Sequence, residues 1–455
     1  MSTSIYQQYK PYFSKILSLS YPIVIGQLGI VLMGVADVVM VGKLEPINLA
    51  AVSLANSVYF LLAIVGIGTL TAISPLVAKA KAEGHNNECA FLFRDGLKAS
   101  AVLGFILMAG IWILTTNLEW FKQTNEVTAL TKNYLHLLNI GTLPMLFFLA
   151  LKQFSDGLSI TKPAAIITIL AVALNVFINW LLIYGNWGFP AMGLLGTGVA
   201  TTVSRFAMAF AMLWYVLKNV RYKHEIKIKD AKTNDKGLQQ IFAIGLPSGF
   251  QYFFEVGAFA FAAIMIGWIG ATELAAHQVA INIASVTYMI ATGLSAAGSI
   301  AVGDALGRRN RKDIQQSGYA AMILAAVFMG FCALLFSLFT QQIVGFYIQD
   351  QAVSNMAQTL IIIAAFFQLS DGIQCVGLGV LRGIGDTKVP TLIAIVAYWV
   401  IGIPIGYYLG FYTSFGLNGV WIALSIGLTF SALFLSFRFN RRSRLIQLHE
   451  SNHAG

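Results

Sequence analysis

The same residue pattern occurs twice in this chain, and the residue numbers of the two copies differ by an offset of about 225. The sequence LAA stands at 49–51 and 274–276, GxxxTK at 157–162 and 383–388, and GLxG at 193–196 and 416–419. These echoes predict an internal duplication that gives the chain two homologous halves. Homologous halves that each cross a bilayer are a recurring architecture of secondary transporters, in which the substrate path lies between them.

The composition is that of a membrane protein. Hydrophobic residues make up 57% of the 455 residues and charged residues only 11%, less than half of the ~25% typical of soluble domains. The mean hydropathy is +0.74. The apolar residues come in long uncharged runs, and a transmembrane helix needs about 20 such residues. The first run is long enough to span the bilayer, unlike the shorter apolar region of a cleavable signal peptide.

Twelve apolar runs predict an all-α integral membrane protein with twelve transmembrane helices. The predicted spans are 14–40, 48–76, 96–117, 131–154, 163–185 and 193–217 in the first half, and 240–268, 274–302, 316–340, 353–380, 390–410 and 417–437 in the second. The three cysteines, Cys89, Cys332 and Cys375, are too scattered to predict a disulfide framework or a metal site.

Basic residues predict the orientation of these helices. Of the 29 Lys and Arg residues, three lie on one side of the membrane, Arg205 lies inside a span, and the remaining 25 lie on the side of both termini. The positive-inside rule therefore predicts cytoplasmic termini, and an even number of spans requires both termini on one side. This bias also explains the net charge of +10, so the charge does not indicate a nucleic-acid partner.

The spans divide into two lobes of six helices. We expect a first lobe at 1–217, a charged cytoplasmic linker at 218–239, a second lobe at 240–440 and a cytoplasmic tail at 441–455. Because each lobe has six spans, both lobes enter the membrane from the same side. The lobes are therefore expected to be related by a pseudo-two-fold axis along the membrane normal.

Three carboxylates fall well inside predicted spans: Asp37, Glu255 and Asp371. An ionised carboxylate at the bilayer centre costs about 3 kcal/mol on insertion scales, so such residues usually have a function. Glu255 and Asp371 lie at similar depth on two helices of the second half, and neither has a deep Lys or Arg on its own span. We interpret the pair as a cation or proton site. Helix–helix hydrogen bonding by protonated carboxyls is the alternative.

Asp37 has polar residues at a similar depth on two other spans. Asn175 and Asn179 are four residues apart and so share a helix face, and Thr201 lies on the next span. These groups could hold the carboxylate, its proton or a cation, or they could simply join helices by hydrogen bonds. Arg205 is the deep cation, and we interpret it as a snorkelling residue near the cytoplasmic boundary.

Aromatic residues accompany the acids of the second half. Phe253 and Phe254 precede Glu255, and Phe367 precedes Asp371. Aromatic faces bind organic cations with about 0.5–2 kcal/mol per contact, so these rings are candidates for a substrate cavity. The alternative is that they face lipid or neighbouring helices.

Three segments give the chain a family resemblance. The sequences ADVVMVG at 36–42, GLSITKP at 157–163 and LRGIGDTK at 381–388 resemble the multidrug and toxic compound extrusion family. The similarity extends from Tyr21 to about Phe437, and Glu255, Tyr288 and Asp371 resemble the bacterial NorM branch of that family. The resemblance implies a twelve-helix, two-lobed exporter of organic cations, driven by inward flow of Na⁺ or H⁺ across the bacterial cytoplasmic membrane.

The resemblance also implies roles for particular residues. Asp37, Asn175, Asn179 and Thr201 match the polar cluster of the first lobe, and family proposals link protonation near Asp37 to bending of a helix that Pro22 can kink. A Na⁺ ion is expected at Glu255, Tyr288 and Asp371. We expect a lipid-embedded monomer without an organic cofactor.

Other functions are less compatible with the sequence. There is no Walker loop with GK[ST] and no catalytic constellation, so we do not expect an enzyme. A lipid-linked oligosaccharide flippase should carry more Arg and Lys in its cavity, and an exporter of one specific metabolite is a further alternative. The sequence leaves open the substrate, the choice between Na⁺ and H⁺, the lobe that binds the coupling ion and the oligomeric state.

Overall fold

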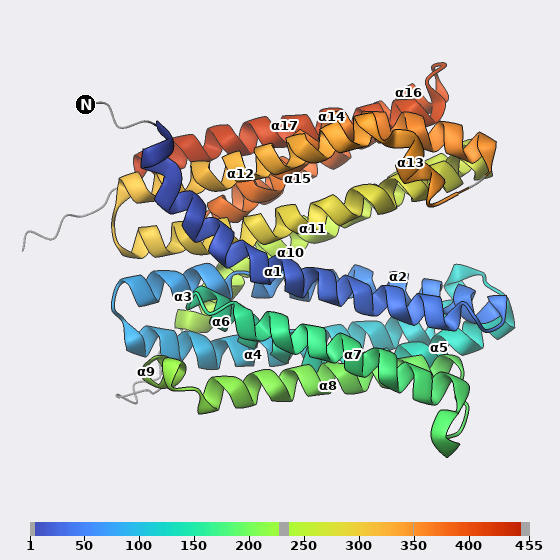
Figure 1. Ribbon diagram of the computed structural model, residues 1–455, viewed down its shortest axis with the longest axis horizontal. Coiled ribbons are helices and arrows are strands. Elements are labelled where there is room, and N and C mark those ends of the chain that lie inside the picture. Colours follow the sequence, from blue (N-terminus) through green and yellow to red (C-terminus); the bar gives the residue numbers. More distant parts are fainter. Residues whose placement is uncertain (1–4, 227–235, 349, 447–455) are drawn as a thin grey trace, which may run out of the picture. The chain divides into compact units, whose positions relative to one another are not determined.

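A computed structural model describes residues 5–226, 236–348 and 350–446, and these residues are helical apart from short connections (Figure 1). The centre of the predicted linker, 227–235, and the end of the predicted tail, 447–455, lie outside the described residues.

The helices of the first half are α1 (Ile5–Val41), α2 (Pro46–Leu70), α3 (Ile73–Ala82), α4 (Asn86–Thr116), α5 (Asn125–Ile140), α6 (Thr142–Gly157), α7 (Lys162–Tyr184), α8 (Leu194–Lys218) and α9 (Lys223–Ile226). Those of the second half are α10 (Lys236–Ile269), α11 (Ala271–Gly307), α12 (Arg311–Leu338), α13 (Thr340–Gly345), α14 (Gln351–Gly383), α15 (Lys388–Ile395), the π-helix η4 (Val396–Gly402), α16 (Ile403–Phe411) and α17 (Gly416–Leu445). Short 3₁₀ turns η1, η2 and η3 lie at Leu118–Phe121, Asn186–Gly188 and Val220–Tyr222.

The twelve predicted spans all correspond to helices of the described residues. Eleven helical segments are long and apolar enough to cross a membrane, and the twelfth span is the pair α5 and α6, which bends by 40° at a short break. Several helices extend beyond the predicted apolar run, because a helix continues past the hydrocarbon core where its ends are polar. The prediction of a twelve-helix membrane protein is confirmed.

Local sequence explains where several helices begin. The Asn310 side chain accepts a hydrogen bond from the Asp313 backbone N–H at the start of α12, and Asp350 accepts from Val353 at the start of α14. Such caps satisfy backbone donors that a first helical turn leaves free. In α7, Pro163 stands in the first turn, where its missing N–H costs nothing.

Internal contacts divide the chain into two units, which we call the N-unit and the C-unit. The N-unit comprises Ile25–Gly249, and the C-unit comprises Met1–Val24 together with Phe250–Gly455. Each unit therefore contains the beginning of the helix that opens the other half. The expected lobe boundary, in the linker at 218–239, differs from this division, which falls inside α1 and α10.

The unit boundary inside α1 and the unit boundary inside α10 fall at corresponding positions of the sequence repeat. Pro22 and Pro247 are related by the same offset as the LAA copies, and each stands inside a continuous helix two residues before a unit boundary. A proline inside a helix removes one backbone hydrogen bond and favours a kink at that position. The sequence prediction named Pro22 and missed its counterpart.

Small residues allow the crossing helices close contact within each unit. In the N-unit, a Cβ atom built on Gly249 of α10 would lie 2.4 Å from the Val65 carbonyl oxygen of α2. In the C-unit, a Cβ atom on Gly293 of α11 would lie 2.2 Å from the side chain of Val24 in α1. Both distances are shorter than a real contact, so a larger residue at either position would force its neighbour to move. Close approach of this kind is how membrane helices gain packing energy.

The first prediction concerns the orientation of the helices. After the three buried native cysteines are replaced by serine, a cysteine introduced at Ser414 should react with an impermeant thiol reagent in intact cells, and one at Lys312 should not. Both positions are exposed and lie at opposite ends of membrane spans. Labelling at Lys312 with protection at Ser414 would reverse the predicted topology. Permeabilised cells, in which both should react, are the control.

The second prediction concerns helix packing. Gly249→Ala should lower the free energy of unfolding by about 1–3 kcal/mol, because an added methyl group overpacks the α2–α10 contact. Gly34→Ala is the matched control, since a Cβ atom there meets no atom within 4 Å and alanine favours a helix by up to about 1 kcal/mol. The measurement is the apparent melting temperature in detergent. An equally stable Gly249→Ala protein would contradict this account of the contact.

Candidate functional site: two buried carboxylate clusters

Asp37 lies in the N-unit where α1, α7 and α8 meet. Asn179 donates through Nδ2 to Asp37 Oδ1 at 2.6 Å, and the Thr201 hydroxyl donates to Oδ2 at 2.7 Å. Asn175 closes the group, since its Oδ1 accepts from Asn179 at 3.2 Å and its Nδ2 donates to the Thr201 hydroxyl at 3.4 Å. The structure thus brings together all four polar residues that the sequence suggested. We call this group the Asp37 cluster.

The Asp37 cluster is buried, because none of its four side chains is more than 5% exposed. A buried carboxylate is costly unless donors compensate for the lost water, and here each carboxylate oxygen has one donor. Asn179 Oδ1 has no hydrogen-bond partner among the described residues. Rotation of this amide would present an oxygen to Asp37. The cluster can therefore accept a proton on the carboxyl group or offer several oxygen atoms to a cation.

Arg205 has a structural explanation that the sequence did not suggest. Its guanidinium Nη1 donates to the Tyr59 hydroxyl at 2.8 Å and to the Leu138 carbonyl oxygen at 3.2 Å, and its Cζ lies 4.7 Å from the centre of the Tyr59 ring. Leu138 precedes the break between α5 and α6, where carbonyl groups lose their helical partners. The interpretation of Arg205 as a snorkelling residue is wrong: its charge is bound at this helix break.

Glu255 is the centre of a second cluster, in the C-unit. Its Oε2 accepts from Gln251 Nε2 at 3.0 Å on the same helix, α10. Its Oε1 lies within reach of three donors: the Tyr288 hydroxyl at 3.1 Å, Gln374 Nε2 at 3.3 Å and the Tyr398 hydroxyl at 3.5 Å. These donors come from α11, α14 and η4, so three helices and α10 meet at one carboxylate. We call this group the Glu255 cluster.

The sequence prediction included Glu255 and Tyr288 but missed Gln251, Gln374 and Tyr398. Gln374 and Tyr398 are fully buried and form two short contacts with one another, Nε2 to hydroxyl at 2.6 Å and hydroxyl to Oε1 at 3.0 Å. A polar residue in an apolar span was the available signal for both. An amide or a phenol costs less to bury than a carboxylate, so neither residue stands out in the sequence as strongly as Glu255 does.

Asp371 lies on α14, one helical turn before Gln374, and is 9% exposed. If both were ionised, Glu255 and Asp371 would repel one another, because both are buried in the same unit. The basic residue of α14 is Arg382, eleven residues after Asp371 and beyond the predicted span 353–380. Arg382 at the end of α14 is buried, and its Cζ lies 5.7 Å from the centre of the Tyr252 ring on α10.

The three phenylalanines predicted to line a substrate cavity have different environments. Phe253 and Phe254 are partly buried, with ring centroids 5.7 Å apart in an edge-to-face arrangement. Phe367 is buried in the hydrophobic core of the C-unit, with its ring centroid 5.6 Å from that of Trp421. The structure therefore places Phe367 in the packed core, and leaves Phe253 and Phe254 as the more accessible rings.

A buried ion pair escaped the sequence prediction. Lys152 Nζ lies 2.7 Å from Asp156 Oδ2 on α6, and both side chains are at most 5% exposed. The pair has the four-residue spacing of a helical ion pair, but it lies near the end of a span and was counted with the cytoplasmic charges. Lys152 neutralises the charge of Asp156, whereas the donors around Asp37 are uncharged.

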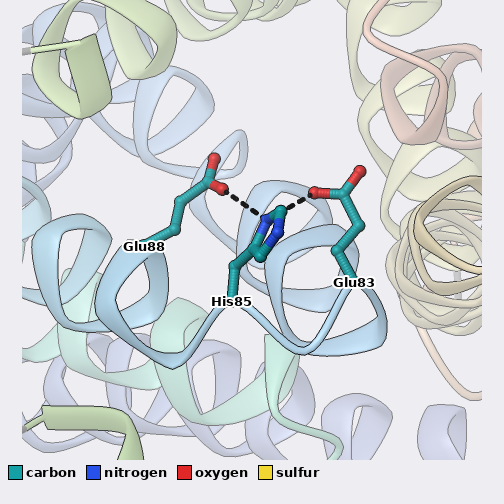
Figure 2. Close-up of side chains that lie close together, drawn as sticks. All are labelled: Glu83, His85 and Glu88. Atoms are coloured by element: carbon teal, nitrogen blue, oxygen red, sulfur yellow. Dashed lines mark ion pairs between the residues drawn. The ribbon is translucent and has the colours of Figure 1, made fainter.

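Three metal-ligand side chains also lie together outside both clusters, between α3 and α4. Figure 2 shows Glu83 and Glu88 on either side of the His85 ring, whose Nδ1 lies 3.3 Å from Glu83 and 3.5 Å from Glu88. His85 is exposed, both carboxylates are partly exposed, and Glu83 is also 3.9 Å from Lys79. We interpret this group as a solvated set of surface ion pairs.

Comparison with known proteins identifies the family. The MatE family model matches residues 22–181 and 247–408, one stretch in each half of the chain. The chain belongs to the MatE family. The Multidrug resistance protein NorM of Vibrio cholerae is 32% identical over 452 residues, which cover 97% of this chain and 99% of the relative. The Multidrug resistance protein MdtK of Yersinia enterocolitica is 33% identical, with 95% and 96% covered. The predicted resemblance to this family and its NorM branch is confirmed.

Solved MatE-family structures share the fold. An outward-facing structure of a multidrug resistance MATE family transporter has a TM-score of 0.88 at 20% identity, with 98% of this chain and 99% of the other covered. A eukaryotic MATE transporter has a TM-score of 0.85 at 18% identity, with 96% and 98% covered. These likenesses confirm the two-lobed, twelve-helix MatE fold expected from the sequence.

The third prediction concerns Asp37. Asp37→Asn should reduce drug efflux by roughly 10- to 100-fold, because the amide keeps the size of the side chain but loses the charge that Asn179 and Thr201 stabilise. The protein should still insert, since removal of a costly buried charge does not weaken membrane insertion. The measurement is dye efflux from cells, normalised to the amount of protein in the membrane. Glu45→Gln, at an exposed carboxylate just beyond α1, is the control and should retain efflux. Normal efflux by Asp37→Asn would reduce Asp37 to a structural residue.

Proposed function

We propose that this chain is a cation-coupled antiporter that exports organic, mostly cationic compounds in exchange for Na⁺ or H⁺. The observation that carries the proposal is the pair of buried carboxylate clusters, in which Asp37 and Glu255 are surrounded by uncharged donors. A buried carboxylate that lacks a fixed counter-ion can bind a mobile cation or a proton. The names of the relatives, multidrug resistance proteins, support drug efflux as the function of such a site.

The exchange follows from competition for the same negative charge. With both Glu255 and Asp371 ionised, their repulsion raises the free energy of the empty site. Na⁺, H⁺ or an organic cation each relieves this repulsion. Once one of them is bound, the site has a lower affinity for the others. Phe253 and Phe254 next to Glu255 would add aromatic contacts for an organic cation but little for Na⁺. Coupling by mutual exclusion needs no further moving part at the site.

The two clusters differ in how tightly donors close around the acid. The two donors of Asp37 lie at 2.6 and 2.7 Å, whereas the three donors around Glu255 Oε1 lie at 3.1–3.5 Å. Hydroxyl donors usually approach an acceptor to about 2.7–2.8 Å, so the Glu255 cluster is loosely closed. We therefore assign the coupling Na⁺ to Glu255, Tyr288 and Asp371, and proton binding to Asp37 with Asn175, Asn179 and Thr201.

The remaining parts of the proposal follow the sequence. We propose that the chain works as a monomer in a bacterial cytoplasmic membrane with both termini in the cytoplasm, and that Pro22 permits α1 to bend. A lipid-linked oligosaccharide flippase is the second candidate. The buried acids of both clusters argue against it, since they would repel a pyrophosphate group.

The fourth prediction tests this function directly. Proteoliposomes containing the purified protein should move a fluorescent organic cation when a Na⁺ or pH gradient is imposed, each gradient being applied separately. Detergent-solubilised protein should bind the same dye less tightly as Na⁺ rises at fixed ionic strength, or as pH falls. Transport that ignores both gradients would contradict the proposal.

Two variants connect this behaviour to the second cluster. Glu255→Gln and Asp371→Asn should each weaken the dependence of dye affinity on Na⁺, because either change removes one of the two repelling charges. Glu273→Gln, at a partly exposed carboxylate near the start of α11, is the matched control and should behave like the wild type. An unaltered Na⁺ response in both cluster variants would exclude the Glu255 cluster as the coupling site.

A further inference from the structure

The helix that supplies Tyr398 to the Glu255 cluster contains a seven-residue π-helical segment. The backbone N–H of Ile403 bonds to the Tyr398 carbonyl oxygen, five residues earlier, and the wide turn extends over Val396–Gly402. Single π turns in α-helices are rare and frequently lie at functional sites. The corresponding helix of the first half, α7, is an uninterrupted α-helix from Lys162 to Tyr184. The π turn is therefore a departure from the duplicated pattern.

The local sequence explains this turn. Pro404 has no backbone N–H for the Val400 carbonyl oxygen, so the regular α-helical bond at that step cannot form. Gly427 of α17 also packs against the turn, and a Cβ atom there would lie 2.6 Å from the Ala397 carbonyl oxygen. A proline and a close glycine contact thus stabilise the wide turn at this place.

The turn directs two adjacent side chains toward two adjacent residues of α10. Tyr398 reaches Glu255, as described above, and the indole N–H of Trp399 donates to the carbonyl oxygen of Phe254 at 2.9 Å. The second bond is shorter than any of the three at Glu255 Oε1. A helical carbonyl has a second lone pair, so it can accept the indole without losing its helical bond.

The Trp399 ring is also fixed by packing. A Cβ atom on Gly257 would lie 3.4 Å from Trp399 Cζ2, so the indole lies over this glycine on α10. The rings of Phe254 and Phe261 flank it, with centroids 6.4 and 6.0 Å away. Phe254, Gly257 and Phe261 share one face of α10 at helical spacing. Trp399 therefore binds α10 by a hydrogen bond and by a row of aromatic contacts.

We propose that Trp399 is a positioning residue for the Glu255 cluster, on the premise of the proposed cation coupling. By fixing the Phe254 carbonyl against the π turn, Trp399 sets the distance between Tyr398 and Glu255. The cluster then stays open enough for a cation while its donors remain in place. The Trp399 indole N–H bonds to the Phe254 carbonyl oxygen and not to the carboxylate.

The Tyr398–Trp399 pair lacks a counterpart in the first half. The offset of 226 that relates the two GxxxTK copies places Tyr398 and Trp399 opposite Val172 and Ala173. Those two side chains can neither donate a hydrogen bond nor bridge two helices in this way. The Asp37 cluster instead takes a direct donor from Asn179, whose amide also donates to Asn175, on the next turns of α7. The indole contact is thus specific to the cluster with the longer hydrogen bonds.

The fifth prediction is that removal of the indole N–H weakens cation binding without weakening drug binding. Trp399→Phe, and replacement of Trp399 by the isosteric benzothienylalanine, should raise the Na⁺ or H⁺ concentration that half-displaces a bound fluorescent dye by about 2- to 12-fold, the effect of losing one hydrogen bond. Dye affinity without competing cation should not change. The isostere keeps the shape of the ring, so it tests the bond even if Trp399→Phe folds poorly.

Two comparisons make this test specific. Trp268→Phe changes another ring in the same aromatic row, 6.2 Å from Phe261, and should leave the half-displacing concentration unchanged. In a Glu255→Gln background, loss of the indole N–H should have no further effect on dye affinity at any cation concentration.

The outcomes separate the inference from the function on which it rests. Wild-type protein whose dye affinity ignores both cations would contradict the proposed function. An intact wild-type response that is unchanged in both Trp399 variants would overturn the positioning role alone. An equal loss of dye affinity with and without cation would also overturn it, because that result indicates a general packing defect.

Discussion

The cost of burying a carboxylate in an apolar helix bundle governs this protein. Asp37 and Glu255 are both about 4% exposed, and among the described residues neither has a basic side chain as its hydrogen-bonding partner. Each acid is instead held by amides and hydroxyls from neighbouring helices, which compensate for lost water but do not neutralise the charge. The Lys152–Asp156 pair shows the other solution, a fixed counter-ion. Only the first solution leaves a charge for a mobile cation.

Duplication supplied the scaffold, and divergence gave each half its own acid. An offset of 225 places Asp37 opposite Ala262, so Glu255 stands seven residues earlier on its helix than the equivalent position. At the standard rise this is a difference of about 10 Å in depth along equivalent helices. The partners differ as well, since an uninterrupted α7 supplies Asn175 and Asn179, whereas a π turn supplies Tyr398. The halves are thus similar in fold and different in chemistry.

The first helix of each half contributes to both contact units. The contact units divide inside α1 and α10, two residues after Pro22 and Pro247, so each unit is completed by the beginning of the other half's first helix. Gly249 and Gly293 make room for these contacts. A proline that weakens the helix beside such a boundary, together with glycines that permit close packing, lets one continuous helix belong to two packed units.

The sequence alone determined the number and approximate positions of the spans, the duplication and the buried acids, because long apolar runs and charges within them are local features of the chain. It also indicated the Asp37 cluster, since Asn175 and Asn179 share a helix face. Only the tertiary structure decided which donors surround Glu255, where Arg205 binds and which unit holds Met1–Val24. The roles of three residues depend on contacts with α10, more than a hundred positions away in the sequence: Gln374, Tyr398 and Trp399. Such contacts depend on how helices rotate and pack against one another, and hydrophobic periodicity does not specify that.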